Sequence, residues 1–142
     1  MFHAMKWALP LFFVLCLSDG CGNATRQDVN HLQRLDASQF DGFVNIAAQH
    51  FEKEFGIQPK LFDDVEVRVG SVEEIKETCR QEVFGCNIHH DIVVRSDSNL
   101  CQVVVHELGH SAAWYLNGSW DLDHENLAGF FRNDVFRLCR EI

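Results

Sequence analysis

The strongest constraint on the fold is the pattern His-Glu-Leu-Gly-His at positions 106–110. Residues four positions apart lie on one face of a helix, so His106 and His110 can bind the same metal ion. Glu107 follows about 100° further round the helix, where it can take a proton from a water molecule beside that ion. The pattern therefore predicts a metal-binding helix with a general base next to two ligands.

The residues around this pattern favour such a helix. Apolar positions recur over residues 100–116, mostly on the side away from the two histidines. Ser98 or Asn99 can cap the start of the helix, and Asn117 with Gly118 can end it in a left-handed turn. The helix thus offers one face to the core and another to a metal ion.

A third protein ligand is expected from the segment after the helix, because a catalytic zinc ion usually has three protein ligands and one water molecule. The candidates are Asp121, Asp123, His124 and Glu125. We expect His124, since imidazole suits zinc. Glu125 is the alternative, at the start of the last helix, and an aspartate is the third choice. Asp123 is better placed to cap the last helix, and Asp121 can orient a ligand imidazole.

Residues 100–131 resemble the active-site region of the zincin metallopeptidases. More narrowly, they are similar to a group of small bacterial and phage-type proteins. In that group a glycine-containing turn with acidic residues, and then another histidine, follow the H-E-x-x-H motif. The resemblance implies zinc-dependent hydrolysis of a peptide or protein substrate, with Glu107 as general base and His106, His110 and His124 as zinc ligands. A non-catalytic exported zinc-binding or interaction protein and an amidase acting on cell-wall peptides are the alternatives.

The N-terminal residues indicate export. An apolar run over residues 7–17 follows Lys6, and it is too short to be a permanent membrane span. We therefore expect residues 1–20 to be a signal peptide, followed by lipidation at Cys21 as in bacterial lipoproteins. A plain cysteine at that position is the alternative. The expected location is the bacterial periplasm or cell envelope, with membrane contact only through the lipid anchor.

Charge and cysteine content support this organisation. The net charge is −9 and no basic cluster occurs, which argues against nucleic-acid binding. The four cysteines beyond position 21 suit two disulfides in an oxidising compartment. We favour Cys79–Cys86, which closes a short loop, and Cys101–Cys139, which ties the metal-binding helix to the C-terminal region. We expect a monomer.

The remaining patterns predict one α+β domain over residues 35–142, preceded by a polar tether over residues 21–34. Apolar spacing predicts a helix over residues 35–55 and another near the C-terminus. Residues 65–69 and 88–94 have the composition of strands. We therefore expect a short, mostly antiparallel sheet packed by the metal-binding helix and two others.

Several aromatic residues and histidines are candidates for roles beside the metal. Alternation along a strand would point His89 and His90 to opposite faces, so that one could stabilise an oxyanion or both could be solvated. Trp114 and Trp120 would either wall the cleft or belong to the core. Tyr115 lies about 180° from the first histidine on the helix, which argues against a role as oxyanion donor.

Overall fold

The computed structural model of the chain describes residues 29–142. The expected signal peptide, the lipidation site at Cys21 and most of the expected tether lie outside the described residues. The whole of the expected metal-binding domain, residues 35–142, lies within them. No helix among residues 29–142 is both long and apolar enough to cross a membrane.

A four-stranded sheet forms one side of the domain, in the order β1-β2-β4-β3. Its strands are β1 (Gln33–Arg34), β2 (Val67–Gly70), β3 (Gly85–Ile88) and β4 (Asp91–Arg95). The β1/β2 and β3/β4 pairs are antiparallel, whereas the central β2/β4 pair is parallel. The fold is therefore α+β with a short and mostly antiparallel sheet, as expected.

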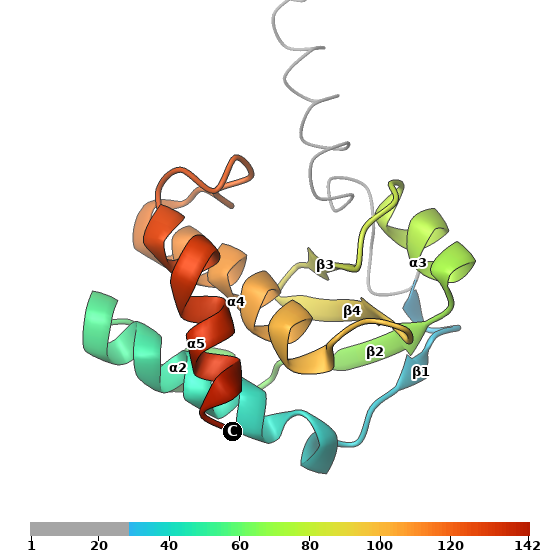
Figure 1. Cartoon of the computed structure of the whole chain (residues 1–142), viewed down its shortest axis with the longest axis horizontal. Coiled ribbons are helices and arrows are strands. Elements are labelled where there is room, and N and C mark those ends of the chain that lie inside the picture. The colour runs from blue at the N-terminus through green and yellow to red at the C-terminus, as the bar shows by residue number, and fades with distance from the viewer. Residues whose placement is uncertain (1–28) are drawn as a thin grey trace, which may run out of the picture.

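Helices pack against both faces of this sheet. Those described are α2 (Asp41–Phe55), α3 (Val72–Cys79), α4 (Leu100–Asn117) and α5 (Val135–Arg140). Figure 1 shows α4 between the sheet on one side and α2 with α5 on the other. The expected metal-binding helix is thus the central element of the domain.

Local signals set the ends of α2 and α4 much as the sequence predicts. Gly56 and Gly118 have φ angles of 71° and 70°, and each ends its helix in a left-handed turn. The Asn99 side chain caps α4 by accepting a hydrogen bond from the Gln102 amide at 3.0 Å. The helix expected over residues 35–55 begins later, because a 3₁₀ turn at Ala37–Gln39 precedes α2.

The expectation of one strand over residues 88–94 is wrong, because the chain reverses within that segment. Ile88 pairs with Asp91, and His89 and His90 form the two-residue turn between β3 and β4. The two histidines have φ angles of 50° and 73°. A tight hairpin turn needs positive φ at both central positions, which Asn-Gly usually signals. Two histidines give no such signal, so the sequence did not reveal the reversal.

The strand β4 separates two apolar clusters, because its side chains alternate between the faces of the sheet. Ile92 and Val94 belong to the main core, together with buried residues of α2, α4 and α5. Val93 packs in a second cluster with Ile75 of α3. Leu108 of α4 is fully buried in the main core, so α4 is fixed by packing along its inner face.

Two disulfides link the four cysteines of the described residues, and both have the predicted partners. Cys79–Cys86 joins the end of α3 to β3, with Cα atoms 6.0 Å apart. Cys101–Cys139 joins the first turn of α4 to α5, with Cα atoms 5.8 Å apart. Two disulfides in a small domain fit the oxidising environment of an exported protein.

Candidate metal centre

Three histidines converge beside α4. His106 and His110 come from consecutive turns of the helix, and His124 comes from the loop that follows it. One ring nitrogen of each lies within 4.8 Å of the others, and the Nε2 atoms of His110 and His124 are 3.3 Å apart. This group can hold a metal ion. Of the candidates for the third ligand, His124 belongs to this group. Glu125, the alternative, is exposed and does not belong to it.

The loop that carries His124 is held by Asp121. The Asp121 side chain is 2% exposed and accepts hydrogen bonds from the amides of Asn126 and Leu127, at 2.9 and 2.8 Å. Its carbonyl accepts a further bond from the His124 amide at 2.9 Å. Asp121 and His124 both have positive φ, 53° and 60°. The loop thus turns back towards α4 around one buried carboxylate.

The structure changes the roles expected for the two aspartates of this loop. Asp123 was expected to cap the last helix, but its carboxylate accepts only from the amide of Glu125, at an exposed position. Asp121 satisfies the amides before the last helix instead. The sequence also allows Asp121 to orient a ligand imidazole, but for His110 the carbonyl of Trp120 has that role. The Nδ1 of His110 donates to it at 2.7 Å.

The protonation of the histidines suits metal binding. Since a carbonyl can only accept, the proton of His110 lies on Nδ1, and the Nε2 lone pair faces the other histidines. Burial lowers the pKa of His110, although the Trp120 carbonyl and the charge of Asp121 partly oppose this. Burial, with His110 and His124 nearby, lowers the pKa of His106 to about 3. Neutral imidazoles are the form that binds metal ions, so the residues present fit a zinc ion.

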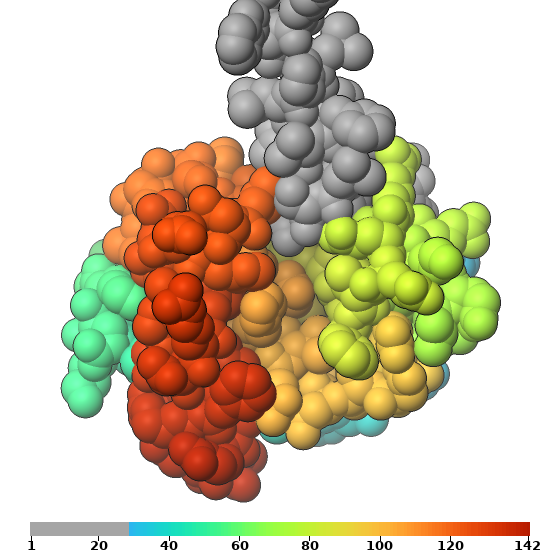
Figure 2. Space-filling model, turned by 45° about the horizontal axis from the view of Figure 1, so that its top comes forward, coloured from blue at the N-terminus to red at the C-terminus, as the bar shows by residue number. Residues whose placement is uncertain are grey.

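Glu107 is close to the histidines and lines the same groove. Its side chain is 6% exposed. The groove has a volume of about 480 Å³. It runs between the segment 81–85 and α5, and residues of α4 form its base. His106, Glu107, His110 and His124 all line it. Figure 2 shows the hollow between the yellow-green segment before β3 and the red C-terminal helix, with gold atoms of α4 at its floor.

A buried polar network that sequence reasoning missed supports the helix behind Glu107. The Asn87 side-chain amide donates to the Glu107 carbonyl at 2.9 Å and to Ser111 Oγ at 2.7 Å. Ser111 Oγ is also 2.9 Å from Nδ1 of His90, and the His90 amide donates to Asn87 Oδ1 at 2.8 Å. Asn87 and Ser111 are 2% and 0% exposed. The β3–β4 turn is therefore tied to α4 at the level of Glu107.

The expected roles of His89 and His90 change with the hairpin. His90 stacks on Tyr115 and Trp120, with ring centroids 4.8 and 5.0 Å apart. Burial, and to a lesser extent His89, lowers the pKa of His90. Neither histidine lines the groove. His90 is thus a packing residue against α4 and Trp120 rather than a residue of a solvated strand.

The aromatic residues of α4 also lie away from the groove. Trp114 is 40% exposed and stacks on Trp120, with ring centroids 4.8 Å apart. Neither tryptophan lines the groove, so neither walls it. The Tyr115 hydroxyl donates to the Leu61 carbonyl at 3.3 Å. This bond directs the hydroxyl away from His106, His110 and His124. That agrees with the expectation that Tyr115 is no oxyanion donor.

Phe131 covers the three histidines, and a π-helix places it there. Its ring lies 4.9, 4.8 and 4.4 Å from the rings of His106, His110 and His124. The π-helical turn, Phe130–Asp134, directly precedes α5. Such wide turns are rare and often lie at functional sites. Apart from an apolar stripe, no feature of the sequence predicts this turn.

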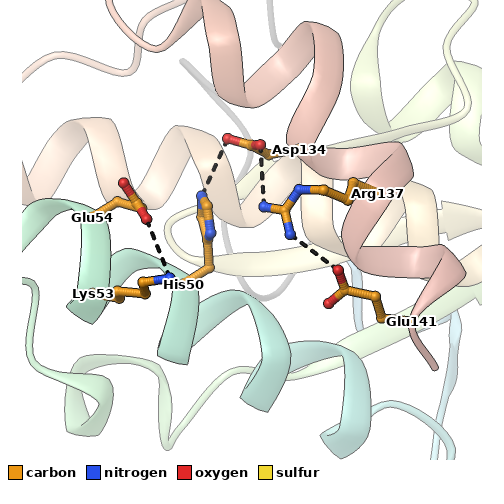
Figure 3. A network of polar contacts seen from close by, with 6 residues as sticks. All are labelled: His50, Lys53, Glu54, Asp134, Arg137 and Glu141. Carbon is orange, nitrogen blue, oxygen red and sulfur yellow. Dashed lines mark hydrogen bonds and ion pairs between the residues drawn. The ribbon is translucent and has the colours of Figure 1, made fainter.

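A polar contact anchors the end of this π-helix to α2. The Oδ2 atom of Asp134 is 3.3 Å from Nε2 of His50, whose ring stacks on Phe130 at 5.8 Å. Figure 3 shows Asp134 between His50 and Arg137, and Arg137 also pairs with Glu141 at 3.1 Å. The π-helix that places Phe131 over the three histidines thus contacts α2 as well as α4.

The comparisons with known proteins give no further identification. No protein-family model, no curated protein and no solved structure matches this chain. The likeness to zincins therefore rests on the motif and on the residues that follow it.

Proposed function

We propose that the protein is a zinc-dependent peptidase. The observation that supports this best is the convergence of His106, His110 and His124 in a groove that Glu107 also lines. Three neutral imidazoles are a common ligand set for catalytic zinc, which keeps an open position for water. A carboxylate beside such a site is the usual general base of a zinc peptidase.

Each residue has a distinct part in the proposed reaction. His106, His110 and His124 would hold the zinc ion. When bound, zinc would act as a Lewis acid, which lowers the pKa of a water molecule towards about 7 and polarises a peptide carbonyl. Glu107 takes the proton of the attacking water and passes it to the leaving amine. Asn87 holds the backbone carbonyl of Glu107 in place during this transfer.

The surroundings suit this chemistry. The low exposure of Glu107 reduces competition from bulk solvent, which strengthens charge interactions at the site. The hydrogen bond from His110 Nδ1 to the Trp120 carbonyl fixes the ring and increases its basicity as a ligand. The proposed setting is the bacterial periplasm or cell envelope, with a peptide or protein as substrate and a monomer as the working unit.

The rival proposal is a non-catalytic zinc-binding protein on the same scaffold. Both proposals use the three histidines, but only the peptidase gives Glu107 a chemical role. The variant Glu107→Gln separates them, because the amide keeps the size of the side chain and cannot act as a base. The neighbouring variant Glu125→Gln is a matched control, since Glu125 is exposed and does not line the groove.

The experiment combines metal analysis with a peptide-cleavage screen on zinc-loaded protein. We expect about one zinc ion per chain in the wild type and in both variants. Cleavage should be lost in Glu107→Gln, with a decrease of at least about 100-fold as expected for loss of a general base, and retained in Glu125→Gln. Zinc binding without any cleavage by the wild type would favour the binding protein. Absence of zinc binding would refute both proposals.

A further inference from the structure

Beyond the histidines and Glu107, the groove is lined mainly by apolar side chains. These are Val83, Phe84, Val103, Phe131, Val135 and Phe136. They come from three parts of the chain, namely the segment before β3, α4 and the C-terminal π- and α-helices. The metal centre therefore opens directly into an apolar region.

The position of Val103 shows on which side of the metal centre this region lies. Val103 precedes His106 by three residues on α4, so the two side chains lie on neighbouring turns of one face. At about 1.5 Å per residue, they are separated by about 4.5 Å along the helix axis. A side chain of a substrate held at the histidines therefore needs to extend by only a few carbon atoms to contact Val103.

Two exposed aromatic residues border this region from opposite walls. Phe84, before β3, is 60% exposed, and Phe136, in α5, is 51% exposed. Phe84 is held in place although it is exposed, because the Arg95 guanidinium lies 4.7 Å from its ring centroid. Both residues line the groove that contains the histidines. Large apolar side chains exposed beside a concave site are typical of ligand recognition.

The charges of the groove indicate which kinds of substrate side chain it would bind. Among residues 29–142, Glu82 is the only charged residue that lines it apart from Glu107 and the histidines, and no lysine or arginine of that range does so. An acidic ligand side chain would therefore meet Glu82, which repels it, while the nearby Arg95 is already paired with Asp97. A basic side chain could pair with Glu82 at the exposed rim, but the apolar residues would contact only its hydrocarbon stem and gain nothing from its charge.

We propose that this part of the groove binds the apolar side chain of a substrate residue next to the cleaved bond, of the size of leucine or phenylalanine. The inference rests on the proposed peptidase function and adds the substrate class to it. The volume of about 480 Å³ is within the range of sites that bind small molecules, and leaves room for such a side chain together with the backbone at the metal centre.

The test uses ligands that are anchored at the metal and differ only in one side chain. The probes are the hydroxamates of N-acetylglycine, N-acetylleucine and N-acetylaspartate, titrated calorimetrically into the zinc-loaded full chain. We expect the leucine compound to bind roughly 10- to 100-fold more tightly than the glycine compound, as is usual for filling an apolar pocket. The aspartate compound should bind no better than the glycine compound.

Surface variants locate the site of this preference. Phe84→Ser and Phe136→Ser, singly and together, should lower the ratio of leucine to glycine affinity by up to about tenfold and leave the glycine compound unaffected. Both side chains are exposed, so these changes spare the core. Leu61→Ser is the matched control, because Leu61 is 43% exposed and lies outside the groove. It should leave the ratio unchanged.

The possible results distinguish this inference from the proposed function. If the glycine compound binds and the leucine compound binds no more tightly, the apolar side-chain site is refuted and the zinc centre stands. The same holds if the leucine preference survives in the Phe84→Ser/Phe136→Ser double variant. If none of the hydroxamates binds to protein incubated with zinc, the metal centre and the inference built on it are both refuted.

Discussion

Replacing Gly109 with alanine tests how closely the C-terminal segment packs on α4. A Cβ atom at this position would lie 2.8 Å from Cε1 of Phe131 and 2.9 Å from Cδ1 of Phe130, and would also overlap Cε1 of Phe130. Phe130 and Phe131 are only 2% and 8% exposed, so neither ring can turn into solvent. The alanine methyl group therefore has no free space, and the π-helical turn must shift.

Two opposing effects set the size of the change. In the interior of a helix, alanine is more favourable than glycine by about 0.8–1.0 kcal/mol. Overfilling a packed core costs typically about 1–3 kcal/mol, and the displacement of two buried rings places this case in the upper half of that range. We therefore expect Gly109→Ala to lower the free energy of unfolding by about 1–2 kcal/mol. Zinc affinity should also decrease, because Phe131 contacts all three histidine rings.

The measurement is urea unfolding of the disulfide-intact protein, followed by tryptophan fluorescence, with and without zinc. Gly42→Ala is a suitable control, because Gly42 lies in α2 and a Cβ atom there would meet nothing within 4 Å. That substitution should stabilise the protein by about 0.4–1 kcal/mol. If Gly109→Ala stabilises the protein as much as Gly42→Ala does, the packing of Phe130 and Phe131 described above is refuted.

Three further predictions concern the ligands, the crosslinks and pH. His124→Ala should lose zinc binding while Glu125→Ala keeps full affinity, and the reverse result in metal titrations would assign the third ligand to Glu125. Replacing Cys101 and Cys139 by serine should lower the free energy of unfolding by up to about 4 kcal/mol, given their sequence separation of 38. In the unreduced wild type neither cysteine should react with alkylating agents, and labelling detected by mass spectrometry would contradict the bridge. Because the pKa of His106 falls from 6.5 to about 3 on folding, the unfolded chain takes up this proton first, and metal-free protein should lose stability as the pH falls through this interval. Urea midpoints measured in EDTA check this, and a flat profile would contradict it.

The features that the sequence predicted correctly depend on neighbouring residues. Each of them involves residues no more than one or two turns apart in α4. They are the spacing of His106 and His110, the cap at Asn99 and the left-handed glycine at Gly118. The disulfide pairing could also be predicted from the sequence. Cys79 and Cys86 are close enough to form a short loop, and pairing them leaves only one partner for each of the other two cysteines. For such features the physical cause is contained in the local sequence.

The features that were missed depend on backbone atoms or on contacts between distant segments. The carbonyl of Trp120 orients His110, and every residue carries a carbonyl, so no residue type could have revealed it. The reversal at His89 and His90 needs a backbone conformation that these residue types seldom adopt. Asn87 acts on the Glu107 carbonyl from 20 residues away, a contact that exists only once β3 lies beside α4.

The loop after α4 shows how the chain can hold a ligand in position before any metal ion binds. Asp121 and His124 both have left-handed backbone conformations, each of which costs roughly 1–2 kcal/mol for a residue other than glycine. Against this, the buried Asp121 carboxylate accepts two backbone hydrogen bonds, and bonds to a charged group each contribute about 1.5–3 kcal/mol. The two contributions are similar in size, so the strained turn can persist without help from a metal ion. The direction of His124 towards His110 therefore follows from the folding of the loop around Asp121, and zinc would meet a site that is already formed.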